Sequence, residues 1–214
     1  MLTLWGRPSS INVQKVLWTL GELGLEHQWI DAGGEAGGLD APAFLAMNPN
    51  GRIPVIEDGG AHVWESNAIV RYLCARYGEG GLWPADPLAR AQGDQWMDWT
   101  LSTLQPAIMG LFWGFYRTPR AQRNERRNAA LIADCAAAIT LLDRHLAARP
   151  FVTDHGFSMA DIPAGTLMYR YFALEIDRPA APAVEAWRGR LEARGAYQAH
   201  VMAPFGELFG RLAY

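Results

Sequence analysis

Residues 47–56 of the chain read MNPNGRIPVI, and this stretch decides most about the fold. Asn-Pro followed by Asn-Gly is typical of a tight loop, and an apolar strand begins directly after it. Pro54 stands at the strand entry, where its missing N–H removes no ladder hydrogen bond. With a cis Ile53–Pro54 bond, the N–H and C=O of Ile53 would turn outward and could pair with an extended peptide. An ordinary turn without a binding role is the alternative.

The segments on both sides of this stretch alternate between strand and helix patterns. Apolar residues recur at helical spacing over 13–23, which predicts an amphipathic helix. Asp-Gly-Gly at 58–60 predicts a hairpin turn because it supplies positive φ angles, and Ser66 is expected to cap a further helix. We expect strands over 2–5, 27–31, 53–57 and 61–64, a Gly-rich loop over 33–38 and a short helix over 42–47.

The pattern changes at residues 78–86, where GEGGLWPAD forms a Gly- and Pro-containing break and the strand patterns stop. Helical patterns follow over 87–117, 119–148, 158–174, 183–194 and from 196 onward. A mixed α/β segment followed by an all-α segment predicts two packed units. We expect an α/β domain over 1–78, a linker over 79–86 and an all-helical domain over 87–214.

The composition narrows the class of protein. Half of the 214 residues are apolar, 19% are charged and the net charge is −3, which favours a globular protein without a nucleic-acid or anionic-membrane partner. No apolar run approaches the roughly 18 residues of a membrane span, and the N-terminus has no signal-peptide pattern. Cys74 and Cys135 fall inside helical patterns. We expect them to be buried thiols in a cytoplasmic protein.

A second candidate binding element follows the hairpin, where residues 65–69 read ESNAI. A helix that starts near Ser66 leaves backbone N–H groups free at its positive end, which suits a carboxylate. Glu65 beside it can take an ammonium group. One helix end thus offers both partners for an α-amino-acid head group, although a plain N-cap beside an exposed acid would have the same sequence.

NPNGRIPVIED, a hairpin and then WESNAIVRYL resemble the glutathione-binding half of the glutathione S-transferase family. The resemblance covers the whole chain and implies a thioredoxin-like N-terminal domain, with a cis bond before Pro54, followed by an all-helical domain. It implies that Ile53 pairs with the cysteine backbone of glutathione and that Arg52 meets its glycyl end. Glu65 and Ser66 would hold the γ-glutamyl group. A homodimer that uses no metal is implied as well.

The loop that reads RPSSIN at residues 7–12 precedes the first helix. In the family this loop supplies the group that touches the glutathione sulfur. Ser10 matches the serine of the theta- and phi-like classes, whereas the tyrosine and cysteine that other classes use have no counterpart here. Asn12 is the second candidate for the sulfur contact and Arg7 the third. Helix capping is the alternative role for Ser9 and Ser10.

A serine hydroxyl suffices for this chemistry. A free thiol has a pKa of about 8.5, and a hydrogen bond to the thiolate beside a positive helix end lowers that pKa. A tenfold gain in thiolate requires about 1.4 kcal/mol, which one charge-assisted hydrogen bond can supply. Ser10 is not expected to act as a hydrolase nucleophile, because the loop contains no base to activate it.

Aromatic residues gather at the end of the first long helical pattern, where residues 111–117 read LFWGFYR. In the family this end overhangs the sulfur, and aromatic walls suit flat apolar substrates. Trp113, Tyr116 and Arg117 are the candidates for an electrophile pocket, while Phe112 and Phe115 suit the core. Arg117 could also stabilise developing negative charge.

The resemblance therefore implies an enzyme that stabilises the glutathione thiolate and conjugates it to a small, mostly apolar electrophile. Glutathione-dependent dehalogenation, ether cleavage and double-bond isomerisation occur on the same fold, and the sequence does not separate them from conjugation. A non-catalytic glutathione-binding or protein-interaction module is the alternative from another class. A glutaredoxin-type reductase would need a cysteine at the first helix, where this sequence has none.

Residues 158–161 read SMAD ahead of an apolar helical pattern, which resembles a capping box. Such a box has reciprocal bonds between the Ser158 hydroxyl, the Asp161 carboxylate and backbone N–H groups. It matches the folding motif of the family's second domain. We expect Asp161→Ala to lower stability by on the order of 1 kcal/mol and to leave glutathione affinity unchanged.

Overall fold

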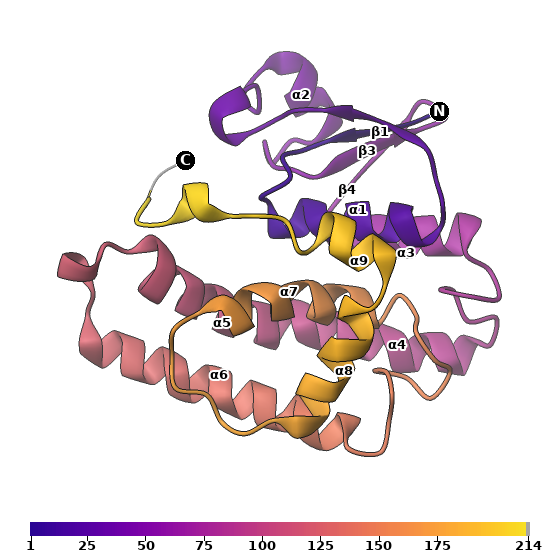
Figure 1. The fold of residues 1–214 in the computed structure, drawn as a ribbon. Helices are drawn as coiled ribbons and strands as arrows, with labels where there is room; N and C mark the ends of the chain where they lie inside the picture. Colours follow the sequence, from indigo (N-terminus) through magenta and orange to yellow (C-terminus); the bar gives the residue numbers. More distant parts are fainter. Residues whose placement is uncertain (213–214) are drawn as a thin grey trace.

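Four short strands form one mixed sheet in the computed structural model, which describes residues 1–212 (Figure 1). The strands are β1 (Leu2–Trp5), β2 (His27–Ile30), β3 (Val55–Asp58) and β4 (Ala61–Trp64), in the order β2-β1-β3-β4. β1 pairs parallel with β2 and antiparallel with β3, and β3 and β4 form the predicted hairpin. The third strand begins at Val55 rather than at Ile53, so the two residues before it stay outside the ladder.

Three helices cover this sheet, as the sequence predicts. They are α1 (Ile11–Glu22), α2 (Pro42–Met47) and α3 (Ser66–Tyr77). Figure 1 shows α1 and α3 side by side between the sheet and the remaining helices, with α2 on the other side. Apolar side chains such as Leu4, Val16, Ile56 and Ile69 form the core between the sheet and these two helices.

The rest of the described chain contains six α-helices: α4 (Pro87–Trp99), α5 (Gln105–Leu111), α6 (Glu125–Leu146), α7 (Asp161–Ala173), α8 (Pro182–Glu192) and α9 (Gly195–His200). The helix expected over 87–117 is interrupted by π-helical turns at Thr100–Leu104 and Phe112–Arg117. The helix expected over 119–148 begins only at Glu125, because a 3-10 turn follows Pro119 and Asn124 is the N-cap, its side chain accepting from the N–H of Arg127. The helix expected from 196 onward ends at His200.

Helix α1 joins the α/β part of the chain to the helical part. It packs against α3 on one side and against α7 and α9 on the other. Trp18 of α1 is fully buried and meets the ring of Tyr197 edge-on, with the centroids 4.8 Å apart. Gly165 of α7 permits this approach, since a Cβ there would lie 2.9 Å from Trp18 Cη2 and 2.6 Å from Leu191 Cδ1. One apolar cluster therefore crosses the junction.

The start of α7 carries a buried carboxylate. Asp161 accepts hydrogen bonds from the N–H of Val152 (2.9 Å), the N–H of Ser158 (3.0 Å) and Nε1 of Trp187 (2.9 Å). Burial raises its pKa to about 6, while these hydrogen bonds act in the opposite direction. The carboxylate half of the expected capping box is confirmed. The hydroxyl half differs, because Ser158 Oγ accepts from the N–H of Ala160 at 3.4 Å.

Both cysteines are buried and free, as expected. Burial raises the pKa of each thiol to about 12, so neither is an ionised nucleophile near neutral pH. Over residues 1–212, no helix combines the length and the apolar character that a membrane crossing requires.

Candidate functional site

The loop before β3 has the predicted cis bond between Ile53 and Pro54. Asn48 holds this loop closed: its Nδ2 donates to the carbonyl of Arg52 at 2.7 Å and its Oδ1 accepts from the N–H of Asn50 at 3.0 Å. Asn48 is buried, whereas the side chain of Arg52 is exposed. The ladder between β3 and its neighbours begins at Val55. The backbone polar groups of Ile53 therefore lie outside the strand ladder.

The start of α3 differs by one residue from the expectation. Ser66 is the first helical residue, and Glu65 takes the N-cap position with φ 68° and ψ 112° and no capping hydrogen bond from its side chain. Within residues 1–212, Glu65 is the only residue other than glycine with a positive φ. Such a conformation costs about 1–3 kcal/mol and is typical of functional sites. The first N–H groups of a helix have no partner within it, so this end suits an anion.

The loop before α1 is held from two directions. Gln14 Nε2 donates to the carbonyl of Pro8 at 2.9 Å, and the guanidinium of Arg170, from α7, donates to the carbonyl of Ser9. Ser9 is buried and its Oγ accepts from Arg7 Nη1 at 2.8 Å. Ser10 is the N-cap residue of α1, but its side chain makes no capping hydrogen bond. The half-buried Ser10 hydroxyl is thus not occupied by the capping role that the sequence left open.

The structure brings two of the predicted residues into one polar cluster. Asn12 Oδ1 accepts from Ser66 Oγ at 3.4 Å and from Gln105 Nε2 at 3.5 Å. Lys15, which no sequence motif indicated, lies in the same cluster with its side chain fully buried. The available signal was its place in α1 among Val13, Val16 and Leu17, where an apolar residue is expected.

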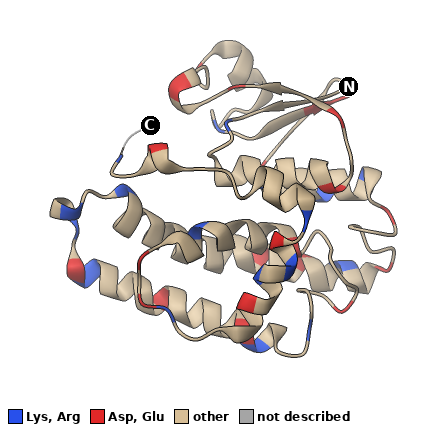
Figure 2. Ribbon diagram, in the orientation of Figure 1, with Lys and Arg blue, Asp and Glu red and all other residues tan. Residues whose placement is uncertain are grey.

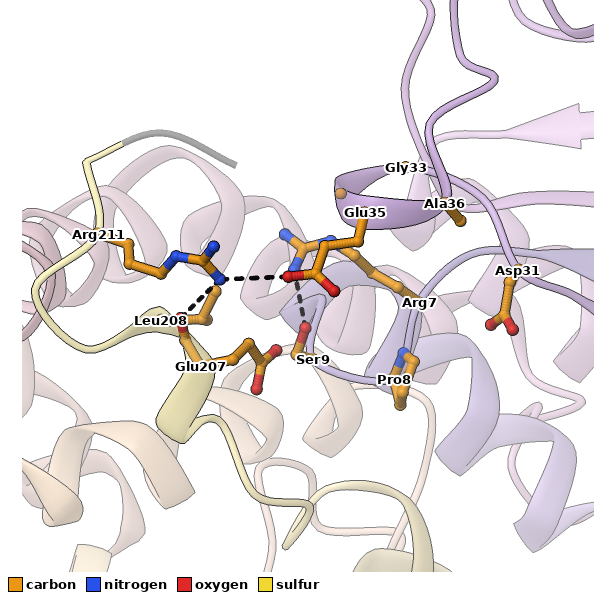
Figure 3. Close-up of a pocket in the computed structure, with 11 residues that line it drawn as sticks. Arg7, Pro8, Ser9, Asp31, Gly33, Glu35, Ala36, Glu207, Leu208 and Arg211 are labelled. Atoms are coloured by element: carbon orange, nitrogen blue, oxygen red, sulfur yellow. Dashed lines mark hydrogen bonds and ion pairs between the residues drawn. The ribbon is translucent and has the colours of Figure 1, made fainter.

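A cavity of about 420 Å³ opens beside this loop (Figure 3). Its walls come from the β1–α1 loop, from residues 31–36 and from the segment after α9, residues 201–212, which we call the tail. Figure 3 shows the contact between Arg211 and Glu35, which joins the tail to residues 31–36 (3.4 Å). Neither Ser10 nor Ile53 is among its lining residues. It adjoins the cis-proline loop nevertheless, since a Cβ on Gly33 in its wall would lie 3.3 Å from Ile53 Cδ1. The cavity therefore lies beside the residues predicted to hold glutathione, and Ile53, Glu65 and Ser66 do not line it.

The three residues predicted for the electrophile pocket lie away from this cavity's lining. Arg117 is fully buried: its Nε donates to the carbonyl of Arg211 at 2.7 Å, and its guanidinium stacks 3.9 Å from the ring centroid of Trp113. Tyr116 stacks on Phe112, lines a different cavity of about 680 Å³, and has its pKa raised by burial. The structure therefore groups these residues under the tail and leaves their role as a prediction.

Charged residues of both signs are interspersed along the chain in both parts of the molecule (Figure 2). Among the residues that the structure describes, no group of three or more His, Cys, Asp or Glu side chains could hold a metal ion.

Comparisons with known proteins place these features in context. The family model "Glutathione S-transferase, N-terminal domain" matches residues 1–75. The chain is 41% identical to glutathione S-transferase GstB of Escherichia coli K12 over 206 residues, which cover 95% of this chain and 99% of that protein. It is 31% identical to glutathione S-transferase 3 of Zea mays over 94% of each chain.

A solved structure shares the whole architecture. It is the theta class glutathione S-transferase of Xanthomonas axonopodis pv. citri with glutathione bound. The TM-score is 0.90 at 45% sequence identity, and the match covers 95% of this chain and 98% of that one. The predicted fold class, a thioredoxin-like domain followed by an all-helical domain, is thereby confirmed.

Proposed function

The chain belongs to the glutathione S-transferase family, and we propose that it holds glutathione between the cis-proline loop and the start of α3. Ile53 offers its N–H and C=O to the cysteinyl backbone of the tripeptide. The N–H groups of the first turn of α3, with the Ser66 hydroxyl, take the γ-glutamyl carboxylate, and Glu65 takes the ammonium. Arg52 meets the glycyl carboxylate. The observation that carries the proposal is the strained Glu65 immediately before the uncapped start of α3.

We propose that Ser10 activates the sulfur. Its hydroxyl stands at the N-terminus of α1 without a capping bond, so it can donate to a thiolate while the helix dipole favours the negative charge. Asn12 is the second candidate, because the Nδ2 of its amide can donate to a thiolate while its Oδ1 accepts from Ser66 and Gln105. Arg7 is the third candidate, because it donates to Ser9 and packs beside Gly34.

The reaction follows from the thiolate. Its sulfur attacks an electrophilic carbon, the S–C bond forms, and the leaving group departs with its electron pair or, in an addition, a proton completes the product. Binding both partners side by side supplies proximity. The proposed electrophile is small and mostly apolar, with Trp113, Tyr116 and Arg117 as its predicted pocket. Dehalogenation, ether cleavage and isomerisation on the same site remain the alternative outcomes.

Binding to immobilised glutathione, followed by an ultraviolet titration of the bound thiolate, tests this function. The wild type should hold a thiolate at neutral pH, and Ser10→Ala should raise the thiol pKa by about one unit, which lowers the ratio of thiolate to thiol about tenfold at any given pH. Failure to bind would favour a non-catalytic interaction module. An unchanged pKa in Ser10→Ala would move the role to Asn12 or Arg7. A panel of aryl halides, haloacids, epoxides and peroxides would then identify the reaction.

We further propose that the protein acts as a homodimer in the cytoplasm. The family supports the dimer, and the two buried, free thiols are consistent with a reducing compartment. Sedimentation equilibrium would give the mass of two 23.7 kDa chains if the first part is right. A monomer at micromolar concentration would contradict it.

A further inference from the structure

Lys15 is the only lysine in the 214-residue sequence, and its side chain is completely buried. Lysine side chains are almost never fully buried unless they are paired. Here the ammonium stands in the middle of α1, on the face that packs against the start of α3 and against α5. An apolar residue would satisfy the packing of this face, so the charge calls for a functional explanation.

The contacts of the ammonium come from three segments. Lys15 Nζ donates to Gln105 Oε1 at 2.7 Å, to Ser66 Oγ at 3.4 Å and to Asn67 Oδ1 at 3.4 Å. Ser66 in turn donates to Asn12. The ammonium thus ties the first turn of α3, where the γ-glutamyl carboxylate is proposed to bind, to the first residue of α5 in the helical part.

All three acceptors of Lys15 are neutral, so among residues 1–212 no hydrogen-bond partner of the ammonium carries a counter-charge. Burial lowers the pKa of Lys15 to about 7, and the exposed carboxylate of Glu65 only partly opposes that effect. Other charged groups on the elements packed around α1 are engaged elsewhere or lie at its far end. They are Arg71 with Asp94 and Asp98, Arg76 with Asp58, Asp161 with Trp187, Arg170 with Ser9, Glu22 with Arg194, and His200 beside Gly21.

We propose that Lys15 is a positioning residue for glutathione: the γ-glutamyl carboxylate, bound one hydroxyl away at Ser66, supplies the missing counter-charge, and binding is accompanied by proton uptake on Lys15. This inference rests on the proposed glutathione site. A carboxylate brought near a buried ammonium favours the charged form, and by linkage the protonated lysine favours the carboxylate by the same factor. Lys15 touches no reacting atom and acts through Ser66 and Gln105.

The single lysine makes a direct measurement possible. Protein labelled with [ε-13C]lysine should show one lysine signal, which can be titrated between pH 5.5 and 9.5 without assignment. The probe is S-methylglutathione, which has no thiol to titrate. We expect the midpoint of Lys15 to lie near neutrality without the probe and to rise by about one unit when the probe is bound. A midpoint that does not move on binding overturns the inference.

Affinity gives the second readout. A one-unit rise from about 7 makes the wild type bind S-methylglutathione about fivefold more tightly at pH 6 than at pH 8 through this group. Lys15→Met should bind about tenfold more weakly at pH 6 and lose this pH dependence. Arg149→Met, which removes a surface cation paired with Asp154, is the control and should match the wild type.

The outcomes separate the two proposals. If the wild type does not bind S-methylglutathione at any pH, the proposed function fails. If it binds, and Lys15→Met keeps both the affinity and the pH profile, only the role of Lys15 fails. Should Lys15→Met not fold by circular dichroism, the titration of the wild-type lysine still decides, because it requires no variant.

Discussion

Two regions of the molecule differ in the kind of atoms that they offer to a ligand. One is the cis-proline loop together with the start of α3, and the other is the aromatic segment 112–117 that follows α5. The candidate groups of the first region are backbone groups of Ile53 and Ser66, which lie at a cis bond and at a helix start. The second consists of side chains at 112–117, and these point where the tail packs over them. A site built from backbone can be predicted from a short motif. A site built from side chains depends on what covers it.

The largest expected effect is a loss of stability in the helical part, at the start of α7. Asp161→Ala would leave three buried donors, those of Val152, Ser158 and Trp187, without an acceptor. We expect a loss on the order of 3 kcal/mol in the free energy of unfolding. This is larger than the loss of about 1 kcal/mol that a capping box alone would give. Urea denaturation measures it, with Asp143→Ala, whose carboxylate accepts from two N–H groups at the start of α8, as a smaller matched loss. A wild-type melting temperature in Asp161→Ala would contradict the assignment.

The second prediction concerns the pH dependence of stability at the junction between the two parts. Between pH 7 and 10.5 the unfolded chain keeps a proton on Lys15 that the folded chain has lost. The free energy of unfolding therefore rises with pH in that window through this group, by at most about 1.4 kcal/mol per pH unit. Urea denaturation at pH 7 and pH 9 should give a steeper rise for the wild type than for Lys15→Met. Equal slopes would show that the buried ammonium is not discharged as described.

The third prediction separates strain from binding at the start of α3. Glu65→Gly should relieve the positive φ and stabilise the protein by up to about 1 kcal/mol, while it weakens S-methylglutathione binding through loss of the carboxylate. Glu65→Gln keeps the strain and should weaken binding by roughly tenfold without changing stability. Calorimetry and thermal melts measure the two quantities. If Glu65→Gly bound the probe as tightly as the wild type does, the ammonium contact would have to be reassigned.

The smallest expected effect concerns the ion pair between Arg211 and Glu35, which line the cavity of about 420 Å³. The Arg211–Glu35 pair is exposed, and exposed ion pairs contribute about 0–1 kcal/mol. Arg211→Ala should leave the melting temperature and the KM for glutathione unchanged, and alter the KM for the electrophile if the cavity admits it. A change in the glutathione KM instead would assign the tail to the glutathione side and weaken the contrast between the two regions.

Much of the α/β part could be predicted because its signals are local. The hairpin turn, the helical spacing in α1 and the loop before Pro54 all lie where the patterns put them. The errors there are small: Ser66 is the first helical residue rather than the cap, and β3 starts two residues late. A one-residue shift at a helix end leaves the direction of its free N–H groups almost unchanged.

The helical part was predicted less well because its signals compete. The 87–117 pattern contains two π-helical turns, and nothing in apolar spacing separates them from regular helix. Arg117 was a candidate for the electrophile pocket, but the tail that packs over it is distant in sequence and its Nε bonds to Arg211. The hydrogen bond from Trp187 to Asp161 could not be predicted from a local motif either, because the two residues are 26 positions apart in the sequence.

The sequence by itself determined the family, through its two motifs. It also determined the order of elements, the cis-proline loop and the adjacent Glu65 and Ser66, because each of these depends on the conformational preferences of a few neighbouring residues. Only the tertiary structure decided that the Ser10 hydroxyl is not occupied by capping, that Arg117 is buried and that Lys15 lies beneath Ser66. The physical reason is distance along the chain. Gln105 is ninety residues from Lys15, and the environment of a buried charge is set by packing that no local pattern records.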